Sequence, residues 1–299
     1  MSLLSIYNRL FPVGLKRKLP ERPRLVFLWL YSLVVSFVTR QRYANVRCYC
    51  MFIGYPRTGH TLLNAMLNAH PRVVLGNELK DLMYVQKGYG RNQLFMMIER
   101  NSRLFHLVRQ SVHTGYSYQI EKQWQGRHEV IEVIGNKDAQ YVSRALMNDP
   151  AALDKLAQRV RLPLRLIHVI RHPLDTIATM AIKSVLINPA KEVPNGAMID
   201  QAIDLYFKYV DTVASFRGQG QYPMLDLYHE DLVKNPHEAF GNVLDFLGLD
   251  NDETFVSDAC SIVFESPNRS RDRVTWTSAQ IQVVEQRSLG VEYLRRYFQ

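Results

Sequence analysis

Short apolar segments alternate along the chain with segments whose apolar residues recur every three or four positions. Apolar runs of strand length occupy residues 48–53, 73–75, 130–134, 164–170 and 224–228. Helical spacing occurs at residues 62–69, 144–161, 176–184, 198–216, 240–246 and 279–298. Strands that alternate with helices usually form parallel sheets, because each connection crosses back over the sheet. We therefore predict an α/β fold, with a mostly parallel central sheet that has helices on both faces.

The first 47 residues are predicted to form a basic and apolar extension of a domain at residues 48–299. Basic residues at 16–24 precede an apolar run at 25–38, which has 14 residues. A membrane-spanning helix needs about 20 apolar residues, and the late start of the run does not fit a signal peptide. Three interpretations remain: a helix packed on the domain, a helix in a membrane interface that residues 16–40 would contact, or a short type II anchor.

The segment at residues 51–80 has the pattern of a phosphate cradle. A strand ends at Gly54, and a turn that contains Gly59 leads into a helix. Such a turn directs backbone N–H groups and the positive end of the helix dipole toward an anion. The two glycines have Walker A spacing, and Thr61 occupies the magnesium-binding position. His60 replaces the Walker lysine, and the cation lies inside the loop as Arg57. This stretch alone also fits an ordinary strand, turn and helix.

Three more charged residues follow predicted strands. Arg171 follows the strand at 164–170, and Thr179 lies about one turn into the next helix, so that both can face one phosphate. Lys137 lies just past the strand at 130–134, where open α/β sheets bind their ligands. Glu78 follows the short strand at 73–75, and a hairpin-like return would bring it beside the loop at 54–61.

The composition limits the range of partners. The formal net charge is +9, which favours an anionic ligand or surface. The sequence has neither the basic arm nor the aromatic repeat of nucleic-acid-binding proteins. Three cysteines do not make a disulfide framework. We expect a cytoplasmic protein, with a membrane-associated or Golgi-anchored form as the alternative.

Several blocks resemble sulfotransferases that use 3′-phosphoadenosine 5′-phosphosulfate (PAPS). Pro-Arg-Thr-Gly-His-Thr at residues 56–61 resembles their 5′-phosphosulfate loop, with His60 as a departure, and R-x-P-x-D-x-x-x-T at 171–179 resembles their 3′-phosphate motif. H-P-x-V-x-x-G-x-E at 70–78 and N-K-D at 136–138 resemble the segments of tyrosylprotein sulfotransferases and their relatives that carry a catalytic glutamate and lysine. Y-x-E-D-L-V at 228–233 is also similar to the family.

The resemblance implies a P-loop-like sulfotransferase fold and transfer of the sulfuryl group of PAPS to a hydroxyl or amine by in-line displacement. The product would be 3′,5′-bisphosphoadenosine (PAP), and the acceptor would be a small molecule, a sugar or a peptide. Glu78 is implied as the general base, Lys137 as the group that stabilises the leaving oxygen, and His60 as an alternative base. The expected cofactor-binding residues are Arg57, Thr58, Gly59, His60, Thr61, Arg171, Thr179, Tyr228, Arg269 and Arg271. Because side chains supply the positive charge, no metal is required.

Two other functions stay open. A kinase or nucleotidase with a degenerate P-loop would need a Walker B carboxylate, for which Asp226 is the candidate. An inactive sulfotransferase-like scaffold would account for His60 in the loop, whereas Glu78 and Lys137 argue against it.

Overall fold

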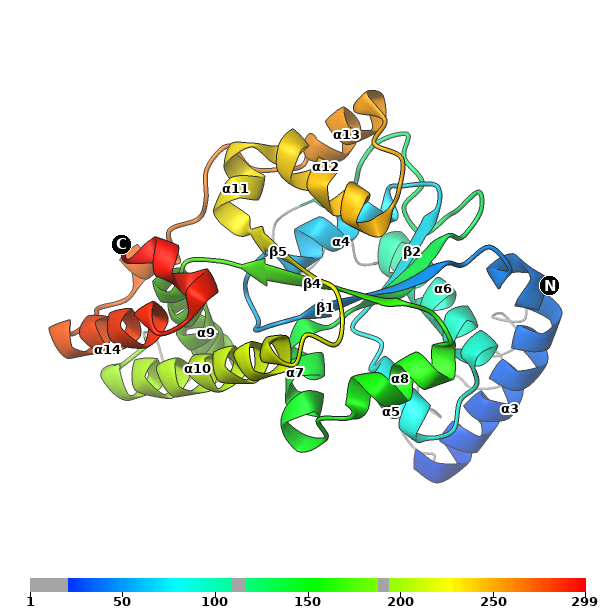
Figure 1. The fold of residues 1–299 in the computed structure, drawn as a ribbon, viewed down its shortest axis with the longest axis horizontal. Helices are drawn as coiled ribbons and strands as arrows, with labels where there is room; N and C mark the ends of the chain where they lie inside the picture. Colours follow the sequence, from blue (N-terminus) through cyan, green and yellow to red (C-terminus); the bar gives the residue numbers. More distant parts are fainter. Residues whose placement is uncertain (1–20, 109–116, 188–193) are drawn as a thin grey trace.

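A single parallel sheet forms the centre of the structure, which is a computed structural model that describes residues 21–108, 117–187 and 194–299. The strand order is β2-β3-β1-β4-β5, and each neighbouring pair is parallel. The strands are β1 (Cys48–Ile53), β2 (Val73–Asn77), β3 (Val133–Lys137), β4 (Leu164–Ile170) and β5 (Met224–Tyr228). Helices lie on both faces of this sheet (Figure 1), which confirms the predicted fold class.

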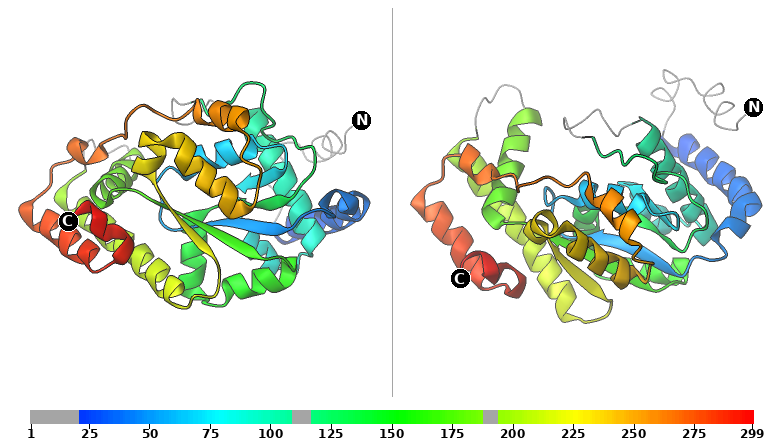
Figure 2. Two further views of the ribbon diagram at one scale, coloured as in Figure 1. Left: turned by 45° about the horizontal axis from the view of Figure 1, so that its top comes forward. Right: turned by 90° about the horizontal axis from the view of Figure 1, so that it is seen from above.

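The helices fall into three groups around the sheet (Figures 1 and 2). One face is covered by α4 (His60–Asn68), α11 (His229–Lys234), α12 (Pro236–Leu247) and α13 (Glu253–Cys260). The other face is covered by α5 (Asp81–Gln86), α7 (Ala139–Asn148), α8 (Ala152–Val160) and α10 (Gly196–Gly218). At the two ends lie α6 (Arg91–Val108) with α3 (Glu21–Thr39), and α9 (Pro173–Ile187) with α14 (Ser278–Leu289). Short 3-10 helices are η1 (Arg40–Tyr43), η2 (Ser270–Arg273) and η3 (Glu292–Tyr297).

The central position of β1 in the sheet explains why its sequence is apolar throughout. All six residues of β1 are buried, because helices cover both of its faces. Successive side chains of a strand point to opposite faces, so Tyr49, Met51 and Ile53 belong to one apolar core. Cys48, Cys50 and Phe52 belong to the other. All three cysteines of the chain are buried and free.

Helix α3 contains the apolar run at residues 25–38 and packs against α6. Gln93 of α6 donates to the carbonyl of Trp29 at 3.1 Å and to the hydroxyl of Ser32 at 2.9 Å. Among the described residues, no helix has the length and hydropathy needed to cross a membrane. Lys16, Arg17 and Lys18, which belong to the predicted membrane-contacting segment, lie outside the described residues.

The predicted bounds of β3 were wrong, and Gly135 is the reason. We expected the strand to end before this glycine, but it continues through Lys137. Gly135 is paired with Cys50 of β1, and a Cβ atom there would lie 1.7 Å from the Cys50 carbonyl oxygen. The glycine therefore permits close approach of two backbones inside the sheet rather than a turn.

Two other predicted connections also differ from the structure. The helix expected at 144–161, with its start interrupted by the turn Asn148-Asp149-Pro150, is two helices, α7 and α8, and the break lies at that turn. The expected hairpin-like return at 73–75 is instead β2, which runs parallel to β3 at an edge of the sheet. Because β3 lies between β2 and β1, Glu78, which follows β2, is closer to the end of β3 than to the turn after β1.

Candidate active site

A cleft of about 1000 Å³ opens at the carboxyl ends of the strands. Ligands of open α/β sheets bind at this edge, because the turns after parallel strands meet there. Its lining includes residues from the segments that follow all five strands, from helix α7 and from the segment before η2. Predicted site residues in the lining are Arg57, Gly59, His60, Thr61, Glu78, Lys137, Arg171 and Thr179.

The turn between β1 and α4 depends on two glycines. Gly54 and Gly59 have φ angles of +133° and +100°, which side chains rarely adopt. A Cβ atom at Gly54 would lie 2.9 Å from Cδ2 of His168, and one at Gly59 would lie 2.7 Å from Cδ2 of His229. Helix α4 begins directly after Gly59, and the first amides of a helix have no acceptor within it. The turn is therefore suited to hold an anion at the mouth of the cleft.

Two polar side chains of this turn face the interior. Thr58 is fully buried, and its hydroxyl lies 3.2 Å from a ring nitrogen of His60. The His60 ring packs edge-on against Phe52. Burial, followed by the nearby Lys137 and His168, holds the pKa of His60 well below its usual value. The lowered pKa gives His60 little tendency to accept a proton, and its ring is a hydrogen-bond partner of the Thr58 hydroxyl.

Lys137 and Glu78 meet at the edge of the cleft. The Lys137 Nζ atom donates to Oε1 of Glu78 at 2.9 Å and to the Thr61 hydroxyl at 3.4 Å. The backbone N–H of Glu78 also donates to the Lys137 carbonyl at 2.9 Å. The lysine side chain is 6% exposed and the glutamate side chain 61%. The pair therefore joins a buried cation under the turn to a carboxylate that reaches the open part of the cleft.

Backbone strain is concentrated at this cleft. Five non-glycine residues of the described ranges have positive φ angles, and three of them, Arg57, Glu78 and Lys80, line the cleft. Their φ values are 74°, 58° and 56°. A left-handed conformation costs a side-chain-bearing residue roughly 1–2 kcal/mol, and such residues cluster at functional sites.

Arg171 connects three segments at the other side of the cleft. Its Nη1 atom donates to the Arg57 carbonyl at 3.0 Å and lies 3.4 Å from the Thr179 hydroxyl. Its Nη2 atom donates to the Asn268 carbonyl, and to the Ser270 hydroxyl at 3.2 Å. The guanidinium is mostly buried, and its Nε atom has no partner among the described atoms. A buried guanidinium between a loop, a helix and a late segment is suited to a phosphate group.

Four predicted cofactor residues do not line the cleft, and one of them is Thr58, which is fully buried. Tyr228 donates its hydroxyl to the Tyr293 carbonyl at 3.2 Å and lines a second cavity. Arg269 is exposed and pairs with Asp272 at 3.2 Å. Arg271 pairs with Asp175 of α9 at 3.3 Å.

Other residues of the same segments occupy the cleft instead. His229, directly after Tyr228, lies against Gly59, and residues 264–268 precede the two arginines. His229 rather than Tyr228 faces the cleft because successive residues at the end of β5 point in different directions. Residues 264–268 rather than Arg269 and Arg271 line the cleft because the chain passes the cleft before it reaches the two arginines.

Sequence reasoning also missed Asp138 and Arg144. Both line the cleft. Burial, and then the nearby Glu78, raise the pKa of Asp138 to about 6. Asp138 follows Lys137 directly in the N-K-D segment, and this adjacency was the available signal. Arg144 lies on α7 at a spacing from Gln140 that puts both on one face of the helix.

Asp226 is not positioned as a Walker B carboxylate. It lies within β5 and faces His168 at 3.0 Å and Arg217, and it lines the second cavity rather than the main cleft. No group of three or more potential metal-ligating side chains was found in the described part of the chain. Asp226, the candidate on which the kinase alternative depends, is therefore not placed at the main cleft.

Comparison with known proteins identifies relatives of this chain. A family model described as "Sulfotransferase family" matches residues 51–253. No curated protein sequence matches the chain.

Solved structures of sulfotransferases are similar to the chain, each at low identity. A sulfotransferase from Mycobacterium avium is 11% identical, with a TM-score of 0.49 over 88% of this chain and 81% of that chain. A mouse sulfotransferase complexed with PAP is 14% identical, with a TM-score of 0.45 over 84% of this chain and 89% of that chain. The sulfotransferase domain from the curacin biosynthetic pathway is 16% identical, with a TM-score of 0.46 over 83% and 99%.

Proposed function

This chain belongs to the sulfotransferase family, and we propose that it transfers the sulfuryl group of PAPS to a hydroxyl or amine acceptor. The observation that carries the proposal is the grouping of Glu78, Lys137 and Arg171 around one glycine-dependent turn. Five residues of the cleft lining are lysine or arginine and three are aspartate or glutamate. This excess suits a donor that carries phosphate and sulfate groups.

The proposed donor site has two anionic ends. The turn at 54–61, with its free helix amides and Arg57, would hold the 5′-phosphosulfate. Arg171 and Thr179 would hold the 3′-phosphate, and the orphaned Nε atom of Arg171 supports this assignment because a buried donor calls for an acceptor. The carbonyl groups that Arg171 now contacts are neutral acceptors, whereas a phosphate would make charge-assisted hydrogen bonds.

Glu78 is proposed to accept the proton of the acceptor group as its oxygen or nitrogen attacks sulfur. The carboxylate is exposed to the cleft and tied to Lys137 at 2.9 Å, so it is oriented without being covered. Lys137, together with the Thr61 hydroxyl, would stabilise negative charge on the oxygen that leaves with the 5′-phosphate. His60 is the weaker candidate for the base because its burial opposes protonation.

An inactive scaffold is the second candidate, and one observation favours it. The imidazole of His60, which is the departure from the family motif, lies 3.2 Å from the Thr58 hydroxyl, so this hydroxyl already has a partner within the turn. Such a protein would retain PAP affinity through Arg171 and the turn but would show no transfer.

Calorimetric titration of the full chain with PAP, with ATP and magnesium as the comparison, tests the donor class first. Metal-independent binding of PAP alone is the expected result. Binding of ATP with magnesium alone would contradict the proposal, as would absence of binding to both. With binding established, a panel of alcohol, amine, sugar and tyrosine-peptide acceptors with PAPS separates an active enzyme from a scaffold, because only the former produces PAP.

A further inference from the structure

The outer face of α3 is apolar, while its inner face is partly polar. Ser32 and Ser36 face the protein and are 0% and 4% exposed, whereas Phe37 and Val38 are 68% and 76% exposed. Helices on a water-exposed surface usually have the opposite arrangement. Nothing in the described part of the chain covers this outer ridge, which consists of Leu30, Leu33, Val34, Phe37 and Val38.

The ridge follows helical spacing and has a groove along each side. Val34 and Val38 border a cavity of about 340 Å³ between α3 and α6. Leu33 and Phe37 border another, of about 620 Å³, near the start of α6. The residues recur at intervals of three and four, so they form one continuous stripe along the helix. An exposed stripe of this kind on a soluble protein marks an interaction surface.

Positive side chains border the ridge on both sides. Arg40 lies over the Phe37 ring at 4.2 Å, and Arg91 lines the same groove. Arg42, Arg100 and Arg103 line the other groove. Glu99, a carboxylate in the lining of this same groove, has a side chain that is only 7% exposed and pairs with Arg42 at 3.1 Å and with Arg103 at 3.9 Å. The charge presented to solvent around the ridge is therefore mainly positive.

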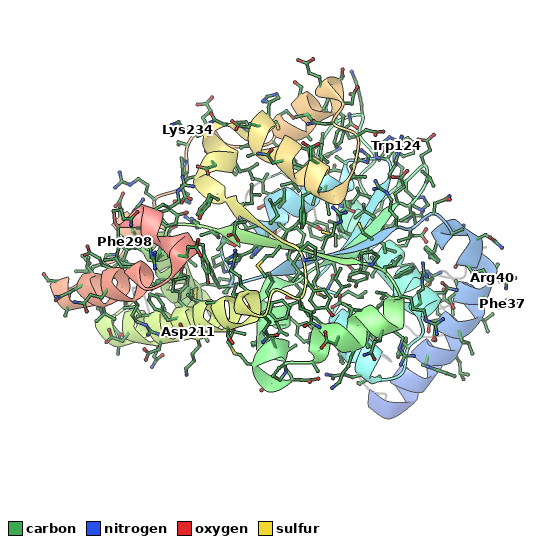
Figure 3. The ribbon with its side chains drawn as sticks, viewed as in Figure 1. Phe37, Arg40, Trp124, Asp211, Lys234 and Phe298 are labelled. Atoms are coloured by element: carbon green, nitrogen blue, oxygen red, sulfur yellow. The ribbon has the colours of Figure 1, made fainter. Side chains whose placement is uncertain are left out.

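We propose that α3 and the adjoining side of α6 dock on an anionic lipid surface, with α3 lying in the interface. Figure 3 shows Phe37 and Arg40 at the outer edge of the molecule, where a flat surface can reach them. The apolar ridge would enter the boundary of the acyl chains, and the arginines would contact phosphate and carboxylate groups of the lipids. The helix would lie on the membrane rather than cross it, because no helix in the described residues is long and apolar enough to span a membrane.

A second copy of the chain fits this face less well. A two-fold contact through the ridge would place the same surface on both sides. Arg40, Arg100 and Arg103 of one copy would then approach the arginines of the other copy, and like charges oppose such a contact. A layer of anionic headgroups has the complementary charge.

Co-sedimentation of the full chain with lipid vesicles tests this proposal. Vesicles of phosphatidylcholine alone are compared with vesicles that also contain phosphatidylserine, at low and high salt. We expect binding to the anionic vesicles that weakens as salt rises, because exposed charges are screened.

Two pairs of double variants separate the apolar and the charged contributions. F37D together with V38D should reduce vesicle binding about tenfold or more. I281D together with V283D is the control: it adds the same two negative charges at exposed apolar residues of α14, and it should leave vesicle binding almost unchanged. R100Q together with R103Q should weaken binding and its salt dependence, whereas K208Q with K234Q, on distant helices, should have a smaller effect.

The proposal fails if the protein binds both vesicle types equally at all salt concentrations, or binds neither. It also fails if F37D with V38D instead abolishes a dimer that sedimentation equilibrium detects in the unchanged protein, since the ridge would then be a contact between copies. Circular dichroism of each variant establishes that a lost signal does not reflect unfolding.

Discussion

The hydrogen bond between Lys137 and Glu78 gives the buried lysine an acceptor and fixes the orientation of the carboxylate. A lysine side chain that is 6% exposed keeps its charge at low cost only when acceptors surround it. Here these acceptors are Oε1 of Glu78 and the Thr61 hydroxyl. The contact orients the carboxylate, and it also means that Lys137 and Glu78 variants are not independent.

Replacement of Glu78 by glutamine tests the assignment of the base. The amide keeps an oxygen for Lys137 but cannot take a proton, so turnover should fall by about 10²- to 10⁴-fold. PAP affinity should change little, because Glu78 does not belong to either proposed phosphate site. Steady-state rates and calorimetry on the same preparation measure the two effects. Unchanged turnover would remove Glu78 as the base, and E265Q, at another carboxylate of the cleft lining, is the matched control.

Replacement of Arg171 by alanine tests the assignment of the 3′-phosphate. Charge-assisted hydrogen bonds contribute roughly 1.5–3 kcal/mol, so PAP affinity should fall roughly 10- to 100-fold. The affinity for AMP, which lacks the 3′-phosphate, should fall much less. Equal losses for both nucleotides in calorimetric titrations would indicate a general disturbance of the cleft, because Arg171 also binds the Arg57 carbonyl. R144A, at an exposed arginine that also lines the cleft, serves as the comparison.

Asp138 should make stability depend on pH in an unusual direction. Its pKa is raised from 3.8 to about 6, first by burial and then by Glu78. A raised pKa in an acid means that the folded state holds the proton more tightly than the unfolded state. Stability is therefore lost as pH rises through this range. D138N should raise the melting temperature at about pH 7.5 and leave it unchanged at about pH 4. A gain of equal size at both pH values would show that the carboxyl charge is not the cause.

The sequence could predict which motifs carry charge, but not always which residue faces the cleft. Glu78 and Lys137 meet because each directly follows or ends a parallel strand, and their strands are neighbours. Tyr228 and His229 lie at a strand end where a difference of one residue changes the direction of the side chain. The sequence does not specify that phase, and in the structure it is His229 that borders Gly59.

At the scale of elements, the turn from β1 to α4 is the most constrained connection of the site. G59A should destabilise the protein, because it combines a φ of +100° with a Cβ position 2.7 Å from His229. G88A is the matched control, since Gly88 has a φ of +83° and no atom within 4 Å of the added Cβ. We expect G88A to cost about 1 kcal/mol and G59A about 1–3 kcal/mol more. Urea unfolding measures both, and similar costs would mean that the His229 contact is easily relieved.

A second change distinguishes collision from backbone strain. Adding H229A to G59A should recover the part of the loss that arises from the His229 ring, and it should leave the cost of the φ angle. If the double variant is no more stable than G59A alone, the contact with His229 does not account for the difference from G88A.

The predicted strands also show where local patterns carry enough information. β1, β4 and β5 match their predicted ranges because apolar runs between polar or turn-forming residues mark both ends. β3 does not, because Gly135 and Asn136 look like a turn in the sequence and yet lie inside the sheet. Their role depends on the neighbouring strand, since the Gly135 position is fixed by the Cys50 backbone. Long-range contacts of this kind are not encoded in a local window.

At the scale of the whole molecule, the question is whether residues 1–47 behave as an extension or as part of the core. The sequence predicts an extension because a basic stretch and an apolar run precede the first strand, which begins at residue 48. In the structure, Tyr43 of η1 donates to Glu99 at 2.7 Å, and Gln93 binds the α3 backbone and Ser32. The bonds of Tyr43 to Glu99 and of Gln93 to Ser32 are buried, and buried hydrogen bonds couple the elements that they join.

We therefore expect α3 to unfold together with the sheet in one transition. Q93A would leave the Gly90 amide without its side-chain acceptor and would remove both bonds that Gln93 donates to α3, at the Trp29 carbonyl and the Ser32 hydroxyl, which should cost about 1–3 kcal/mol. If α3 belongs to the cooperative unit, this loss lowers the melting temperature of the whole protein, as measured by calorimetry and by fluorescence together. Q158A, at an exposed glutamine of α8, should have almost no effect. A separate early transition that Q93A shifts alone would show that α3 and η1 are an independent extension, because an element that unfolds by itself changes only its own equilibrium.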